Sequence, residues 1–191
     1  MADAVRLGAR KRILLTAYDL FSQRGVRDVS VDEIIRTSGV AIATFYRHFS
    51  SKNELAAEFL QLRSELWSTE AVVAESQRRS REPRSRLLAI FDIFDEWFQR
   101  EDFEGDSFVN VLIEMGPQHP LGRASIEHLG DVRQSVEQMA EDASLRDPLN
   151  FARTFQILMK GAIIGAMMGD SLAAQRTRGV ADLLIAEHES Q

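Results

Sequence analysis

The sequence predicts an all-α protein of about nine helices. Apolar residues recur three and four positions apart along most of the chain, which is the period of an amphipathic helix. No alternation of apolar and polar residues, the pattern typical of a half-buried strand, continues for more than a few residues. Glycine, proline and short polar residues separate the periodic segments, and these are the residues that begin and end helices.

Composition indicates an ordinary globular protein. The 191 residues are 45% hydrophobic and 27% charged, enough for one or two domains with a sizeable core. Cysteine is missing, which excludes disulfides and thiolate zinc sites. The N-terminus shows no signal peptide, and the most apolar segment, 157–168, is too short to cross a bilayer and contains Lys160. We therefore expect a soluble, cytoplasmic protein.

The charge is distributed unevenly along the chain, although the net charge is only -6. Residues 1–53 contain nine Lys or Arg and five Asp or Glu, whereas residues 54–191 contain fourteen and twenty-four. A basic head on an acidic body is the asymmetry expected when one end of a protein meets phosphates. We therefore expect the head alone to contact nucleic acid.

The first predicted helix begins near Arg10 and ends at Gly25. Its inner face carries apolar residues at helical spacing, namely Ile13, Ala17, Leu20 and Phe21. Positive charge is unfavourable at the start of a helix dipole. Two interpretations of the basic cluster at this start stay open, a solvated helix start or a contact with phosphate; the cluster comprises Arg6, Arg10, Lys11 and Arg12.

The segment Ser30 to Lys52 predicts two short helices separated by a tight turn. Ser30 and Glu33 form a capping box, in which the hydroxyl accepts from the Glu33 amide and the carboxylate reaches back to the Ser30 amide. Gly39 is suited to the left-handed conformation that follows a helix.

The second short helix, 42–49, has one apolar and one polar side. Phe45 and Phe49 lie four apart and can anchor it in a core. Its other faces carry hydrogen-bond donors, Thr44, Tyr46, Arg47 and His48. A helix, a turn and a second helix with exposed donors are typical of a helix-turn-helix.

Beyond Lys52 the periodicity predicts long helices with apolar stripes. Ser51 can cap the first, Pro83 fits the first turn of the second, and Asp147-Pro148 opens one that is apolar nearly all round. The expected ranges, besides the helix that Asp147-Pro148 opens, are about 52–76, 84–101, 107–115, 121–142 and 172–188.

The segment Ile13 to Leu55 resembles the N-terminal domain of the tetracycline-repressor (TetR) family of bacterial regulators. The resemblance covers under a quarter of the chain. It rests on Ile13, Ala17, Leu20-Phe21, Gly25, Ser30-Val31, Ile34, Ser38-Gly39-Val40, Thr44-Phe45-Tyr46, His48-Phe49, Lys52 and Leu55.

The resemblance implies a DNA-binding domain over residues 1–53 and a ligand-binding and dimerisation domain over residues 54–191. It implies a homodimer that binds a near-palindromic DNA operator as a repressor and releases it when a small effector binds. Activation instead of repression stays open, as does an alternative function: a ligand-binding helical module with non-specific or architectural DNA binding.

Site residues follow from the resemblance by position. It implies phosphate contacts from Tyr46, His48 and Lys52 with help from Ser30 and Thr44. It also implies that Ile42, Ala43 and Arg47 face the bases or their nearby phosphates. Chemistry adds that Arg47 could bind guanine O6 and N7, whereas Ile42 and Ala43 could touch only thymine methyls. Ile42 could instead be a buried apolar staple.

The sequence departs from the family's usual pattern at two positions in this region. Ala41 stands where the family usually has a polar capping residue, so the second short helix depends on Phe45 and Phe49 for its anchoring. Ala43 stands where the family often has glycine, which adds a methyl group to the surface that faces DNA.

Aromatic and apolar residues of the C-terminal region suit either a solid core or a mostly apolar ligand pocket. Arg63, Glu114 and Arg153 could add polar anchors for an effector. The candidate pocket residues are Leu62, Leu66, Trp67, Phe91, Phe94, Trp97, Phe98, Phe108, Leu112, Met115, Phe155 and Met159.

Dimerisation is predicted through the last two helices, which would form a four-helix bundle with their symmetry mates. Gly161, Gly165 and Gly169 recur every fourth position and would allow another helix to approach closely.

The sequence contains no strong motif for catalysis or for metal binding. No nucleophile elbow, phosphate loop or paired-histidine motif is present, so we expect neither an enzyme nor a cofactor. A metal site formed by His119 and His128 with Glu114 and Glu127 is conceivable, but their spacing matches no strong ligand pattern, so we expect no bound metal.

Overall fold

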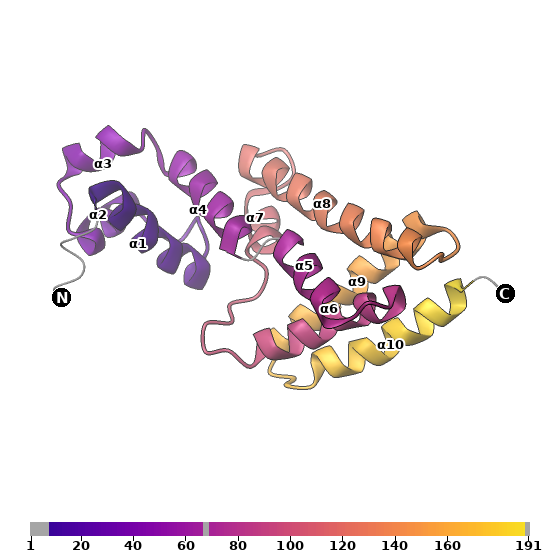
Figure 1. Ribbon diagram of the computed structural model, residues 1–191. Helices are drawn as coiled ribbons and strands as arrows, with labels where there is room; N and C mark the ends of the chain where they lie inside the picture. Colours follow the sequence, from indigo (N-terminus) through magenta and orange to yellow (C-terminus); the bar gives the residue numbers. More distant parts are fainter. Residues whose placement is uncertain (1–7, 67–68, 190–191) are drawn as a thin grey trace. The chain divides into compact units, whose positions relative to one another are not determined.

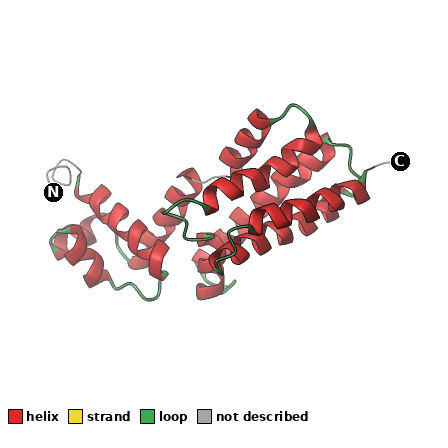
Figure 2. Ribbon diagram, turned by 90° about the horizontal axis from the view of Figure 1, so that it is seen from below, coloured by secondary structure: helices red, strands yellow, loops and turns green. Residues whose placement is uncertain are grey.

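The computed structural model describes residues 8–66 and 69–189. Over these residues the chain forms ten α-helices and no β-strand, so the predicted all-α class is confirmed (Figures 1 and 2). None of the helices in these two ranges is both long and apolar enough to span a bilayer. The chain divides into two compact units, each with its own contacts.

The first unit contains the described residues up to Leu66 together with residues 107–127. The α1 helix packs against α2, α3 and α4, and α7 packs against α4. A distant part of the sequence therefore joins the N-terminal helices. In chain order its helices are α1 (Ala9–Arg24), α2 (Val31–Ser38), α3 (Ile42–His48), α4 (Lys52–Leu66), α7 (Ser107–Met115) and the first turns of α8 (Pro120–Asp142).

The second unit contains residues 69–106 and 128–189. The α10 helix packs against both α9 and α6, and α5 packs against α6. Its helices are α5 (Thr69–Arg79), α6 (Pro83–Phe98), the remainder of α8, α9 (Pro148–Met167) and α10 (Ala173–His188).

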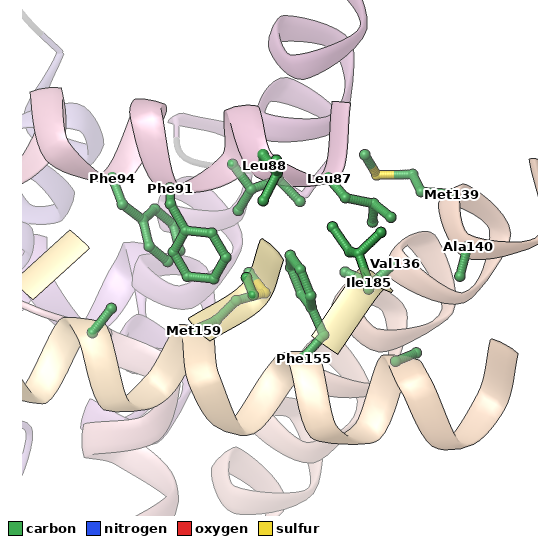
Figure 3. Packing of buried hydrophobic residues seen from close by; sticks show 14 of the residues in the cluster. Leu87, Leu88, Phe91, Phe94, Val136, Met139, Ala140, Phe155, Met159 and Ile185 are labelled. Atoms are coloured by element: carbon green, nitrogen blue, oxygen red, sulfur yellow. The ribbon is translucent and has the colours of Figure 1, made fainter. Parts of the chain in front are cut away.

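The core of the second unit lies where α6, α8, α9 and α10 converge (Figure 3). Phe91 of α6 faces Phe155 of α9, with 5.2 Å between ring centroids, and Phe151 stacks on Phe155 at 5.4 Å. Val136 and Met139 enter from α8. Burial of such large side chains contributes about 25 cal/mol per Å² of apolar surface, so this cluster stabilises the unit.

Helix boundaries agree closely with the predicted ones except after Lys52. There the sequence predicts one helix to about residue 76, and the structure describes α4 up to Leu66 and α5 from Thr69, while residues 67–68 lie outside the described residues. The functional division at residues 53 and 54 stays a prediction.

Candidate nucleic-acid interface

Local capping fixes the start of α2. The Ser30 hydroxyl accepts a hydrogen bond from the Glu33 amide at 3.1 Å, as the capping box predicts. The second hydrogen bond predicted for the capping box, from the Ser30 amide to the Glu33 carboxylate, is wrong. The Glu33 carboxylate instead accepts a hydrogen bond from Arg24 at 2.7 Å. The Arg24 hydrogen bond lowers the pKa of Glu33. An ion pair to α1 thus replaces a local bond and ties the two helices together.

The turn between α2 and α3 depends on Gly39. Its φ of 66° and ψ of 35° lie in the left-handed region, as predicted for the residue that ends the helix. Its amide donates to the Ile35 carbonyl, which satisfies one of the carbonyl groups left free at the end of α2. A side chain at this position would be strained, so glycine sets the direction in which α3 begins.

The α3 helix begins without a side-chain cap, as the sequence predicts from Ala41. The Ala41 carbonyl accepts from the amides of Thr44 and Phe45, at 2.9 and 3.1 Å. Phe45 and Phe49 are fully buried, with ring centroids 6.1 Å apart. Tertiary packing of these two rings therefore holds the helix where local capping does not.

The opposite face of α3 is open. Ile42 is 61% exposed and Tyr46 is 55% exposed. The buried-staple interpretation of Ile42 is therefore wrong, because Phe45 and Phe49 already fill the core side. Ala43 and Arg47 are also exposed, whereas Thr44 and His48 are half-buried. The structure thus brings the predicted base-facing residues together on one accessible surface.

Lys52 lies at the start of α4, and its ammonium is partly engaged within the protein. Its Nζ donates to the Val29 carbonyl at 2.9 Å and to the Arg27 carbonyl at 3.3 Å. The predicted phosphate contact of Lys52 is not tested by this arrangement and stays a prediction. The carbonyl contacts place its positive charge beside the loop that precedes Ser30.

Glu54, in the first turn of α4, accepts from the amide and the hydroxyl of Ser50 at 2.7 and 2.6 Å. These hydrogen bonds lower the pKa of Glu54. Ser51 caps the same helix by accepting from the Glu54 amide at 3.2 Å, as the sequence predicts. The connection from α3 to α4 is therefore fixed by short-range polar contacts.

The basic cluster at the start of α1 is not uniformly available to a partner. The Arg10 guanidinium lies 5.3 Å from the centroid of the Phe49 ring and forms an ion pair with Glu58. Lys11 is exposed and Arg12 is half-buried, while Arg6 lies outside the described residues. The solvated interpretation is therefore incomplete for Arg10, which links α1 to α3 and α4.

The candidate pocket residues fall in both compact units. Phe91, Phe94, Trp97, Phe155 and Met159 belong to the continuous core of the second unit, and Phe98 packs against it. Within the first unit, Phe108 is buried, and Leu62, Leu112 and Met115 are half-buried. Trp67 and the side chain of Leu66 lie outside what the structure describes. The pocket itself stays a prediction.

The three proposed polar anchors have other environments. Arg63 is buried and donates to the Tyr18 hydroxyl at 2.6 Å, and Arg153 is exposed. Glu114 accepts from the backbone amides of Val26, at 3.0 Å, and Arg27. This last contact could not be predicted, because nothing in a helical pattern reveals a partner 88 positions away.

The residues considered for a metal site do not gather. Within ranges 8–66 and 69–189, no three His, Asp or Glu side chains are placed to hold a metal ion together. The Nδ1 atom of His119 accepts from the Leu121 amide at 3.2 Å, which accounts for its position beside α8.

Comparison with known proteins identifies the family. The family model described as "Bacterial regulatory proteins, tetR family" matches residues 13–59. A crystal structure of the TetR-family transcriptional regulator SCO4454 from Streptomyces coelicolor covers 95% of this chain and 96% of its own, with 25% identity and a TM-score of 0.85. This chain belongs to the TetR family.

Curated relatives of the helix-turn-helix (HTH) type match over shorter stretches. An uncharacterized HTH-type transcriptional regulator of Bacillus subtilis, YdgC, is 32% identical over 94 residues, or 46% of this chain and 48% of its own. The HTH-type transcriptional activator FasR of Mycolicibacterium smegmatis is 30% identical over 92 residues, or 48% of this chain and 41% of its own. The chain thus spans about half the length of these relatives. They are named as regulators of transcription, in agreement with the expectation of a non-enzymatic protein.

Proposed function

We propose that this TetR-family chain is a homodimeric, sequence-specific DNA-binding regulator of transcription, and that it acts as a repressor released by a small, mostly apolar effector. The observation that carries this proposal is the division of α3 into a buried side and an open side. Phe45 and Phe49 anchor the helix in the core, while Ile42 and Tyr46 remain exposed. A recognition helix needs this combination, because its reading face must stay free of protein contacts.

The side chains of this face have separate roles in the proposal. Tyr46, His48 and Lys52 bind backbone phosphates, with Ser30 and Thr44 assisting, and these contacts set the register without reading sequence. Arg47 reads guanine, and the exposed Ile42 and Ala43 contact thymine methyl groups. The half-site in this proposal therefore contains both guanine and thymine.

The dimer is proposed to form through α9 and α10. These helices pack side by side, and each also carries large apolar side chains that face away from the core. On α9, Ile157 is 71% exposed, and on α10, Leu183 is 72% exposed. A Cβ added to Gly161 would meet no atom within 4 Å, whereas a Cβ on Gly165 would already meet Ala173 of the same chain. Gly161 thus leaves room for a partner helix, as does Gly169 just beyond the end of α9, whereas Gly165 is used within the chain.

An effector site is proposed at the aromatic cluster of α6 and α9. The Phe91 ring lies 6.0 Å from that of Phe94 and 5.2 Å from that of Phe155, centroid to centroid, and an apolar effector could insert among such rings. The direction of regulation is open to direct test, since the relative FasR is named as an activator. A reporter gene behind the selected operator would distinguish repression from activation.

Selection of genomic DNA fragments by the purified chain tests the proposal. We expect a small set of near-palindromic fragments, bound far more tightly than random DNA, with affinity that falls as salt rises. The selected fragments could instead share no common sequence and bind no more tightly than random DNA at any salt concentration. That result would favour the ligand-binding module with non-specific DNA binding.

A further inference from the structure

Glu114 of α7 makes an unusual contact with the turn between α1 and α2. Both of its carboxylate oxygens accept backbone hydrogen bonds: Oε2 from the Val26 amide at 3.0 Å, and Oε1 from the Arg27 amide. All three residues belong to the first compact unit. Hydrogen bonds to an ionised acceptor are roughly twice as strong as neutral ones. A single side chain thus satisfies two amides immediately before the helix-turn-helix.

The same turn is held by two cations through its carbonyl groups. Lys52 of α4 donates to the carbonyls of Arg27 and Val29, and Arg24 of α1 donates to the carbonyl of Asp28 at 3.0 Å. The anion therefore takes the donors of the turn and the cations take its acceptors. This complementary arrangement fixes the backbone from three helices, α1, α4 and α7.

Gly25 shows that the turn is closely fitted to the carboxylate. A Cβ at this position would lie 3.1 and 3.2 Å from the two oxygens of Glu114, which is closer than ordinary van der Waals contact. Its φ of 83° also lies in the left-handed region. Glycine here allows both the chain reversal after α1 and the approach of α7.

We infer that Glu114 is a positioning residue for operator binding: it sets the α1–α2 turn, and through it the placement of α2 and α3. This inference rests on the proposed function. Glu114 lies well outside the matched residues 13–59, so the helix-turn-helix of this chain depends on a residue from a helix that the family model does not include. Loss of the carboxylate would loosen the turn three residues before the Ser30 cap and disturb the angle at which α3 meets DNA.

The test compares E114A and E114Q with the matched control E127Q in the full chain. Glu127 is an exposed carboxylate of α8 in the same compact unit. For each protein we would measure affinity for the selected operator and for random DNA, together with deuterium exchange in peptides that cover residues 22–30. We expect E114A to lose about tenfold in operator affinity, as expected when hydrogen bonds to a charged group are removed. Affinity for random DNA should stay within about twofold, because phosphate contacts tolerate small changes of angle.

Exchange in the 22–30 peptides should be faster in E114A and intermediate in E114Q, which keeps one acceptor oxygen, and unchanged in E127Q. A residue that only stabilises the fold would lower both affinities by the same factor and lower the unfolding temperature, and this result would overturn the inference. Unchanged operator affinity in E114A would also overturn it while leaving the proposed function intact. A wild-type chain that prefers no operator would instead refute the proposed function first.

A second substitution tests the coupling between Glu114 and the turn from the side of the turn. G25A should weaken operator binding because it combines backbone strain with a clash against Glu114. In the E114A background the clash is gone and only the strain remains, so the effect of G25A should be smaller there. Equal effects of G25A in the two backgrounds would show that the carboxylate and the turn are not coupled.

Discussion

At the scale of single residues, burial decides which side chains of the basic head are free to bind DNA. Arg10 lies on Phe49 and pairs with Glu58, and Arg24 pairs with Glu33. Part of the positive charge that marks this region in the sequence is therefore neutralised within the fold. Arg47 is exposed on the open side of α3, and it is the arginine that we propose to read a base.

Substitutions at Arg47 and Tyr46 should have different consequences. R47A should relax the preference at one or two base pairs by about 1–3 kcal/mol, because a bidentate contact to guanine is lost. R47K is the matched control: it keeps the charge but not the planar fork, so it should restore non-specific affinity without restoring the base preference. Binding to a panel of operators with single base changes would measure both effects.

Y46F removes only the hydroxyl that is proposed to donate to a phosphate, so it should weaken binding to every DNA by a similar factor. The same operator panel would show this as a uniform shift. If R47A also weakens every operator equally, Arg47 binds phosphate and the reading of guanine belongs to another residue.

At the scale of helices, local signals predicted most of the fold. Ser30, Gly39 and Asp147 lie at helix ends as expected, because capping and left-handed conformations depend on a few neighbouring residues. The faces of α3 also followed from spacing alone. The carboxylate contact of Glu114 did not, since it depends on the tertiary placement of α7.

The uncapped start of α3 predicts that A41S stabilises the protein. Ala41 is exposed and has the extended backbone of a capping residue, with φ -74° and ψ 150°, so serine fits without strain. Its hydroxyl could accept from an amide in the first turn, which contributes about 1 kcal/mol. For a chain of this length we expect a rise of roughly 2–4 °C in the unfolding temperature. A41V, which offers no acceptor, is the control, and an equal rise in both variants would contradict the capping explanation.

At the scale of the whole molecule, the sequence predicted the family and the basic head but not how distant segments combine. Residues 107–127 join the N-terminal helices in one compact unit, although helix periodicity gives no information about partners far along the chain. The aromatic residues show the same limit. Their spacing is compatible with core or pocket, and in the second unit they form a packed cluster that an effector would have to open.

Assembly provides the last prediction, because a near-palindromic operator requires two copies of α3 in fixed relation. I157E and L183E place charges on the exposed apolar faces of α9 and α10. Burying an unpaired carboxylate in a helical interface is strongly unfavourable, so both variants should sediment as monomers at micromolar concentration. Their operator affinity should fall far more than their affinity for a half-site, since the second contact is no longer held close to the first.

I126E, an equally simple change at an exposed isoleucine of α8, should remain dimeric. If I157E and L183E also remain dimeric, the interface lies elsewhere, and the exposed apolar face of α9 and α10 needs another explanation.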